Sequence, residues 1–345
     1  MKVGSHIESI GVKLPVKKVT SLSITENMKV VPPIKLELIS GIKERNFCSG
    51  TEDAITLAVD AALDCLKYSS LVASDIEMII YCGISKLDSE LTYYYEPAIS
   101  LLVKQSIGSE GALSFDVSNA CAGMITGVHI ANTYIESGIV SNCMVVSGEY
   151  ISSTSKNAVL NMLTPTSLEL ASLTVGDAGT AIILESTTSE TGFEVLDIKT
   201  LGQYSKLCTA KLSKKYPGAQ MFTQMQKLHS ISIDEAPQYV DKCLTEKGLK
   251  YSDIDVVIPH QTAKRAILSG TLKFREYFGY SPKEIVYNLE HNGNTASTTH
   301  FLALYGLLKE KKLKSDDRIL LLALASGLVL GVVVFKPLGL IEKYG

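Results

Sequence analysis

The feature that most limits the fold of this chain is an internal repeat. The segment Ser74–Ile80 (SDIEMII) closely matches Ser252–Ile258 (SDIDVVI), and each follows a predicted helix and a polar turn. Both segments end in a nearly continuous apolar run of strand length, which is typical of a strand buried on both faces. A second copy of such a unit indicates a fold with two similar halves.

Two further matches follow in the same order. A strand-like run leads to Cys121 and a helix rich in small residues in the first half, and a similar run leads to Asn294 in the second. Met144–Gly148 then corresponds to Leu322–Gly327. Three matches in one order predict a duplicated βαβ half, with two mixed sheets packed around shared helices. On this interpretation Cys121 and Asn294 occupy equivalent positions.

The predicted boundary between the halves is the polar stretch Thr187–Gly192, which divides the chain into residues 1–188 and 189–345. A length of 345 residues is consistent with about two domains. The apolar content of 46% is ordinary for a globular protein with a large core. We therefore expect an α/β protein built from two comparable units.

The spacing of apolar residues predicts helices at Thr51–Tyr68 and Glu235–Lys247, and Ser152–Ser172 is expected to be an irregular insertion or cap. The longest apolar run, Ile319–Phe335, contains Gly327 near its middle. It is short and interrupted for a membrane span. We expect two buried strands joined by a tight turn, and no membrane span.

Charge and cysteine content exclude several classes of function. Lys and Arg number 33 and Asp and Glu 36, so the net charge of −3 argues against a partner bound through nucleic-acid phosphates. The seven cysteines are scattered without a CxxC pair, which fits neither a disulfide framework nor a zinc site. We expect a cytoplasmic protein of a reducing compartment, with no metal, no bound cofactor and no nucleic-acid partner.

Cys121 is the strongest candidate for a reactive residue. It lies between the apolar run Leu113–Val117 and the predicted helix Ala122–Ser137. A thiol at such a turn is close to the positive end of a helix dipole, which favours the thiolate that attacks thioesters. The alternative is a buried structural cysteine, which is the commoner role of a free thiol.

His260 and Asn294 extend this candidate site. His260 follows the repeat's second strand, and functional residues of α/β sheets gather at the carboxyl ends of strands. Alternatively, His260 is an ordinary loop residue and Asn294 belongs to an Asn-Gly turn. Together with Cys121 they suggest an acyl-enzyme chemistry. The two polar side chains would then donate hydrogen bonds to the carbonyl oxygen of a second thioester.

Six motifs in order resemble the ketoacyl-ACP synthase III branch of the thiolase superfamily over nearly the whole chain. They are Ser40–Arg45, Asn119–Gly123, Val175–Gly179, Pro259–Gln261, Gly293–Thr295 and Ser326–Gly331. The resemblance implies a thiolase fold, with duplicated βαβαβαββ halves in five layers (α-β-α-β-α). It also implies a homodimer whose acyl substrates arrive as thioesters of coenzyme A or acyl carrier protein.

The resemblance also implies a role for each candidate. Cys121 would be the acylated nucleophile in the first half, and His260 and Asn294 of the second half would hold a thioester carbonyl. The backbone N–H groups of Cys121 and Ser326 would form the oxyanion hole. Arg265 matches a basic residue of the family that meets the carrier protein.

Three positions depart from the housekeeping fatty-acid enzyme of this family. The chain has no Trp to stack on the adenine of coenzyme A, Ile39 replaces a family Arg, and Ala263 replaces a family Asn. These departures favour delivery by a carrier protein.

Glu96 points to a particular branch. Tyr93–Ala98 and Leu170–Gly176 resemble the head-to-head condensing enzymes of olefin biosynthesis and the bacterial α-pyrone synthases. In that branch a glutamate reaches across the dimer into the partner's site. Condensing two non-malonyl thioesters requires a base for an α-proton, whereas decarboxylation of a malonyl group does not. Alternatively, Glu96 is a solvated residue before a proline.

These observations predict a ketosynthase that forms a carbon–carbon bond by Claisen condensation through an acyl-Cys121 intermediate. The reaction is expected to be non-decarboxylative, with Glu96 as base, in specialised metabolism that yields a β-keto acid, an α-pyrone or a cyclised diketone. One alternative is a decarboxylative synthase III that uses malonyl-carrier protein. An alternative of another class is a non-condensing acyl-carrying partner or an O-acyltransferase.

Overall fold

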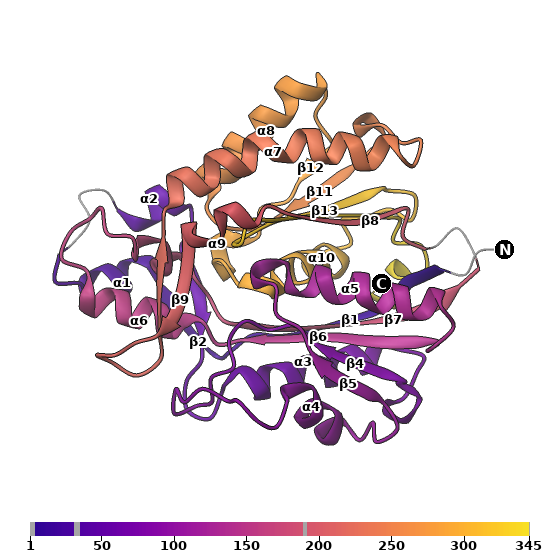
Figure 1. The fold of residues 1–345 in the computed structure, drawn as a ribbon, viewed down its shortest axis with the longest axis horizontal. Coiled ribbons are helices and arrows are strands. Elements are labelled where there is room, and N and C mark those ends of the chain that lie inside the picture. Colours follow the sequence, from indigo (N-terminus) through magenta and orange to yellow (C-terminus); the bar gives the residue numbers. More distant parts are fainter. Residues whose placement is uncertain (1–3, 31–34, 189–191, 345) are drawn as a thin grey trace.

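The computed structural model describes residues 4–30, 35–188 and 192–344 as two stacked five-stranded mixed sheets with helices between and outside them (Figure 1). Residues 189–191 of the predicted boundary lie outside the described residues. From one face to the other the layers are helix, sheet, helix, sheet and helix, so the predicted five-layer thiolase fold is confirmed.

The first sheet is formed by strands from residues 4–187. Its order is β1 (Gly4–Lys13), β7 (Ala178–Thr187), β6 (Asn142–Glu149), β4 (Met78–Tyr81) and β5 (Leu113–Asp116). β4 pairs in parallel with both β5 and β6, whereas β7 is antiparallel to both β6 and β1. β5 is therefore an edge strand.

The second sheet repeats this order and these directions. It runs β8 (Val195–Thr200), β14 (Val329–Phe335), β13 (Ile319–Ala325), β11 (Val256–Pro259) and β12 (Glu284–Ile285). β11 is parallel to β12 and β13, and β14 is antiparallel to β13 and β8. The duplication predicted from the two matching segments is thus present in the strand topology.

The helices also correspond pairwise. The outer layers hold α3 (Ala54–Tyr68) and α4 (Ile99–Ile107) on one side, and α7 (Met225–Thr245) and α8 (Lys264–Phe278) on the other; α5 (Gly123–Glu136) and α10 (Thr299–Lys309) lie between the sheets. A helix covered on two faces must be apolar almost all round. In α10, six of the eight buried residues are apolar. α7 begins ten residues before the predicted Glu235, because its first turns are polar and lack a clear apolar period.

A smaller group of elements covers one end of the two sheets, at the left of Figure 1. It includes α1 (Ser21–Glu26), α2 (Leu36–Ser40), α6 (Ser152–Asn161), β2 (Lys17–Thr20), β3 (Glu44–Phe47), and the hairpin of β9 (Cys208–Leu212) and β10 (Ala219–Thr223). The expected irregular segment Ser152–Ser172 therefore contains a helix. The buried Asp177 stabilises its start by accepting hydrogen bonds from the Ser152 N–H (2.7 Å) and hydroxyl (2.6 Å).

The apolar run Ile319–Phe335 forms the antiparallel hairpin of β13 and β14, as predicted. Strand pairing corrects the third repeat match. Met144 faces Ile79 in the first sheet, and Leu320 faces Val257 in the second, so the counterpart of Met144 is Leu320 and not Leu322. Within the described residues, no helix has the length and apolar character needed to cross a membrane.

The packing of the first sheet against α3 requires a glycine at position 148. A Cβ at Gly148 would lie 1.9 Å from the Ala54 carbonyl oxygen and 2.8 Å from the Ala58 nitrogen. We expect Gly148→Ala to lower the free energy of unfolding by about 1–3 kcal/mol, because helix and strand must separate. Gly202→Ala is the control, since nothing lies within 4 Å of its Cβ. Equal urea midpoints for the two variants would contradict this packing constraint.

Candidate active site

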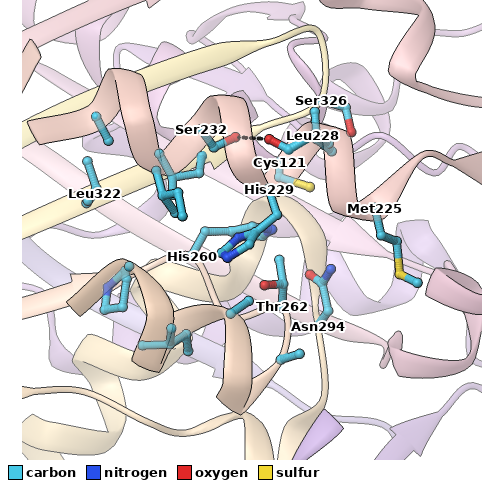
Figure 2. Close-up of a pocket in the computed structure, with 18 of the residues that line it drawn as sticks. Cys121, Met225, Leu228, His229, Ser232, His260, Thr262, Asn294, Leu322 and Ser326 are labelled. Carbon is cyan, nitrogen blue, oxygen red and sulfur yellow. Dashed lines mark hydrogen bonds between the residues drawn. The ribbon is translucent and has the colours of Figure 1, made fainter. Parts of the chain in front are cut away.

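One cavity of ≈250 Å³ brings together residues from both halves of the chain. Cys121, His260, Asn294 and Ser326 all line it, as do Ala171 and Thr174 and residues of α7, α8, β9 and β10. Figure 2 shows Cys121 across the cavity from His260 and Asn294. Residues far apart in sequence thus meet where the predicted site requires them.

Cys121 lies on a short 3-10 helix, η2 (Ala120–Ala122), between β5 and α5. The predicted strand-to-helix turn is therefore present. Small residues allow the close approach expected there, since a Cβ at Gly123 would lie 2.3 Å from the Cys82 carbonyl oxygen. Burial, with smaller effects of Cys208 and Glu149, raises the pKa of the Cys121 thiol above its usual range. The thiolate predicted from the helix dipole is thus not the resting form, because desolvation opposes it.

Cys121 has a structural counterpart other than the predicted Asn294. A second 3-10 helix, η6 (Ala296–Thr298), precedes α10 as η2 precedes α5. Ala120 (φ 47°) and Ala296 (φ 52°) both adopt the left-handed backbone that is uncommon for residues with a Cβ. Ser297 therefore corresponds to Cys121. The predicted residue, Asn294, lies three residues before Ser297, between α9 (Leu289–Asn292) and this turn.

His260 follows β11 and is almost fully buried. The backbone N–H of His260 donates to the Leu322 carbonyl at 3.0 Å. The side-chain amide of the next residue, Gln261, donates to the carbonyls of Pro259 (2.8 Å) and Val286 (2.9 Å). Burial, and then the neighbouring His300, lower the pKa of His260 to about 3. The imidazole is therefore neutral near pH 7. Its Nδ1 has no hydrogen-bond partner among the described residues.

Asn294 is held by backbone bonds to a loop of the first half. Its N–H donates to the Thr174 carbonyl and its carbonyl accepts from the Gly176 N–H, both at 2.9 Å. Its Oδ1 accepts from the Ala296 N–H at 3.0 Å, which leaves the side-chain NH₂ to donate within the cavity. A Cβ at Gly176 would lie 2.1 Å from the Asn292 carbonyl oxygen, so this approach requires glycine.

Arg45 holds the same first-half loop, which contains Thr174 and Gly176, through the neighbouring Leu173 carbonyl. The side chain is fully buried, and its guanidinium donates to the Leu173 carbonyl and to the Ser21 hydroxyl, both at 3.0 Å. Burial lowers the pKa of Arg45 to about 10, so the group is still charged at neutral pH. The motif around Arg45 thus contributes to the loop that positions Asn294.

Glu149 is a buried residue near the site that no sequence motif indicated. It ends β6 and accepts N–H bonds from Ile84 (3.0 Å) and Ser85 (3.1 Å) and a bond from the Ser297 hydroxyl. Burial raises the pKa of Glu149 to about 7. Glu149 thus links residues of the first half to Ser297, which lies on the turn that corresponds to the Cys121 turn. These hydrogen bonds hold the two halves together. Only its place at the end of a buried strand could have indicated it.

The remaining predicted residues lie in different settings. Ser326 lines the cavity from the turn between β13 and β14. Arg265 is exposed on the first turn of α8. Glu96 is exposed before α4 and is not among the residues that line the cavity of its own chain. A single chain therefore does not bring Glu96 to Cys121. Cys208 and His229 line the cavity without having been predicted.

Family models match both halves of the chain. The model for 3-oxoacyl-[acyl-carrier-protein] synthase III matches residues 115–202, and the model for its C-terminal part matches residues 244–336. The β-ketoacyl-[acyl-carrier-protein] synthase III of Coxiella burnetii (strain Dugway 5J108-111) is 26% identical over 338 residues, which cover 96% of this chain and 99% of the relative. The corresponding protein of Listeria monocytogenes (strain 10403S) is 24% identical, with coverage of 97% and 99%.

Solved structures share the fold. The 3-oxoacyl-[acyl-carrier-protein] synthase III of Aquifex aeolicus has a TM-score of 0.82 at 23% identity, with coverage of 96% of this chain and 100% of that one. A cysteine-to-serine variant of Xanthomonas campestris OleA, with bound lauric acid and lauroyl-CoA, has a TM-score of 0.84 at 22% identity, with coverage of 97% and 100%. The chain therefore belongs to the ketoacyl-ACP synthase III-like branch of the thiolase superfamily, and it is a condensing enzyme of the acyltransferase type.

Proposed function

We propose that this enzyme joins two acyl thioesters by a non-decarboxylative Claisen condensation, with Cys121 as the acylated nucleophile and Glu96 of a second copy as base. The product would be a β-keto acid, an α-pyrone or a cyclised diketone. The observation that carries the condensing chemistry is the single cavity that Cys121 shares with the neutral His260 and the amide of Asn294.

The first step is acylation of the thiol. Because the resting Cys121 is protonated, its attack on a thioester requires a proton acceptor. The imidazole of His260 lines the same cavity and would relay that proton. Because its low pKa disfavours a lasting imidazolium, the proton would pass to the departing pantetheine thiolate as the new thioester forms. The backbone N–H groups of Cys121 and Ser326 would stabilise the negative charge on the carbonyl oxygen.

The second step is condensation. The carbonyl oxygen of the second thioester would accept hydrogen bonds from His260 Nε2–H and from the Asn294 NH₂. Since no described residue accepts or donates a hydrogen bond at His260 Nδ1, either tautomer is accessible in the two steps. Glu96 would remove the α-proton, the carbanion would attack the acyl carbonyl, and Cys121 would leave as the thiolate. The β-ketoacyl thioester formed would then lose its thiol, to water to give a β-keto acid or by cyclisation to give a ring product.

The position of Glu96 fits delivery from a partner subunit. Glu96 lies on the surface just before α4, and the next strand, β5, is the free edge of the first sheet. A free edge can pair with another chain. β5 leads within five residues to Cys121, so a partner docked along this edge lies near the nucleophile turn. A homodimer of this kind would bring two such turns close to each other.

The second candidate is a decarboxylative condensation with malonyl-carrier protein. It is favoured by the relatives named β-ketoacyl-[acyl-carrier-protein] synthase III and by the absence of Glu96 from the lining of its own chain's cavity. In that reaction the loss of CO₂ generates the carbanion and Glu96 has no role. An acyl-carrying partner or an O-acyltransferase is less favoured, because His260 and Asn294 line the cavity of Cys121 and would both serve as donors to a thioester oxygen.

Replacing Glu96 separates the two condensations. We expect Glu96→Gln to retain the acyl-Cys121 adduct in intact mass spectra but to lose condensation of two acyl thioesters by about a hundredfold or more, because a general base is removed. Glu90→Gln is the matched control, since Glu90 is exposed on the same loop. Full condensation by the Glu96→Gln variant, or product that appears only with CO₂ release from malonyl-carrier protein, would exclude the role of Glu96.

Arg265 tests delivery by a carrier protein. We expect Arg265→Glu to raise KM for acyl-carrier protein by about tenfold, because a surface charge is reversed against an acidic partner, and to leave KM for the acyl-pantetheine thioester unchanged. Arg275→Glu, at the exposed far end of α8, is the control. An equal effect on both substrates would show that Arg265 does not contact the carrier.

The pH dependence of acylation tests the state of His260. Because burial lowers the pKa of His260 from its ordinary value of 6.5 to about 3, the imidazole stays neutral as the pH falls through 6.5. We therefore expect single-turnover acylation of Cys121 to show no loss centred on that ordinary value. An acid limb centred there in the wild type, and absent in His260→Asn, would contradict a buried neutral imidazole.

A further inference from the structure

The carboxylate of Asp116 joins the edge strand β5 to the loop that carries Glu96. Asp116 is the last residue of β5, and its side chain is only 10% exposed. Its Oδ2 lies 2.5 Å from the Lys86 ammonium and accepts a hydrogen bond from the Ile99 N–H (3.2 Å). Its Oδ1 accepts from the Ser100 N–H at 3.0 Å. One largely buried side chain thus binds both ends of the segment between Lys86 and α4.

The first turn of α4 depends on this carboxylate. The residue before the helix, Ala98, has no side chain that could cap it. The first N–H groups of a helix lack partners within the helix, and a carboxylate there also meets the positive end of the helix dipole. Asp116 supplies that carboxylate from a neighbouring strand of the first sheet, so a tertiary contact fixes the start of α4.

Lys86 holds the other end of the segment. Its carbonyl accepts a hydrogen bond from the Tyr94 N–H at 2.7 Å, and the next residue, Leu87, pairs with Tyr93 in an antiparallel bridge. The Lys86 side chain is only 20% exposed, and a cation removed from water in this way requires a partner. The ion pair with Asp116 therefore holds this closed loop against the sheet.

The Asp116 carboxylate is charged at neutral pH. Burial alone would raise its pKa, but the hydrogen bonds from the Lys86 ammonium and the Ser100 N–H outweigh burial and place the pKa below its ordinary value. Removal of either charge would leave the other without its partner in a poorly hydrated place. The two charges therefore act as a unit.

Glu96 lies between these two anchors and has no support of its own. Among the residues that the structure describes, neither Glu96 nor the preceding Tyr95 has a hydrogen-bond partner. The position of the Glu96 carboxylate therefore depends on where Tyr94 and Ala98, on either side of it, are held.

The turn that carries Cys121 is supported separately. The Val117 N–H donates to the Tyr81 carbonyl at 2.8 Å, and the Asn119 side-chain amide donates to the Thr126 hydroxyl, also at 2.8 Å. Loss of the buried ion pair would therefore leave the thiol in place.

We propose that Asp116, paired with Lys86, is a positioning residue for condensation, because it fixes the loop from which Glu96 reaches the active site of a second copy. This inference rests on the proposed role of Glu96 as base. A general base must lie within hydrogen-bond reach of the proton that it removes, and a displacement of about 1 Å can cost about a hundredfold in rate. Loss of the ion pair should slow condensation and spare acylation of Cys121, which uses no group from this loop.

Two variants that break the same ion pair test the proposal. Asp116→Asn keeps the size and a cap acceptor but loses the charge, and Lys86→Met removes the ammonium. With octanoyl-pantetheine as substrate, intact mass spectrometry follows the Cys121 adduct, and product mass follows the joining of two acyl groups. We expect each variant to acylate at the wild-type rate but to condense about tenfold or more slowly. The double variant should be no slower than the slower single one, because both changes remove one interaction.

The Glu96→Gln background separates positioning from a general structural effect. There, Asp116→Asn or Lys86→Met should not lower the residual condensation further, because the base that they position is already gone. An equal additional loss in that background, or wild-type condensation in both single variants, would overturn the proposal. A wild type that joins no two acyl groups, or full condensation by Glu96→Gln alone, would refute the proposed base itself, which is a different result.

The control for a lost ion pair is Asp255→Asn. Asp255 also binds a lysine (Lys283, 2.5 Å) and a backbone N–H (Arg318, 2.9 Å), but it lies just before β11, outside the cavity lining and the Glu96 loop. Acylation and condensation should both stay at wild-type rates, and slower condensation here would contradict a specific role of Asp116. If Asp116→Asn does not acylate, Lys86→Met, which changes only the loop, carries the test.

Discussion

The catalytic cavity depends on two backbone hydrogen bonds that join the halves of the chain. Asn294 donates to the Thr174 carbonyl and accepts from the Gly176 N–H, which holds a loop of the second half beside a loop of the first. The approach is so close that a Cβ at Gly293 would lie 2.8 Å from the Thr174 carbonyl oxygen. The buried guanidinium of Arg45 fixes the adjoining Leu173 carbonyl. If this contact moved, the amide of Asn294 would lose its direction relative to Cys121.

The near-symmetry of the fold gives the two halves different chemical tasks. The turns η2 and η6 have the same backbone form and lead into the two central helices, yet one carries Cys121 and the other carries Ser297. The Ser297 hydroxyl has hydrogen-bond partners within the protein: it donates to the buried Glu149 and lies 2.7 Å from the Ser147 hydroxyl. The first turn therefore presents its thiol to the cavity, whereas the second contributes to the contact between the halves.

Local patterns in the sequence were sufficient for much of the fold and for the residues that line the catalytic end. The matching segments Ser74–Ile80 and Ser252–Ile258 predicted the duplication because both strands are buried on both faces and must be apolar. The register of the repeat could not be predicted in the same way. Asn294 lies only three residues before Ser297, and the backbone form of the two turns, not a local sequence pattern, identifies Ser297 as the counterpart of Cys121.

The sequence by itself determined the two-half architecture, the strand-to-helix turn at Cys121 and the position of His260 after a strand, because each depends on neighbours in the chain. Only the tertiary structure decided the protonation of the site, since the burial that keeps His260 neutral and Cys121 a thiol comes from distant elements. It alone also showed the extent of the cavity beneath α7 and α8, because a cavity is the space left between helices and a sheet whose residues share no local pattern. The segment around Cys121 made it a candidate, whereas the space beside its thiol depends on how the whole second half packs.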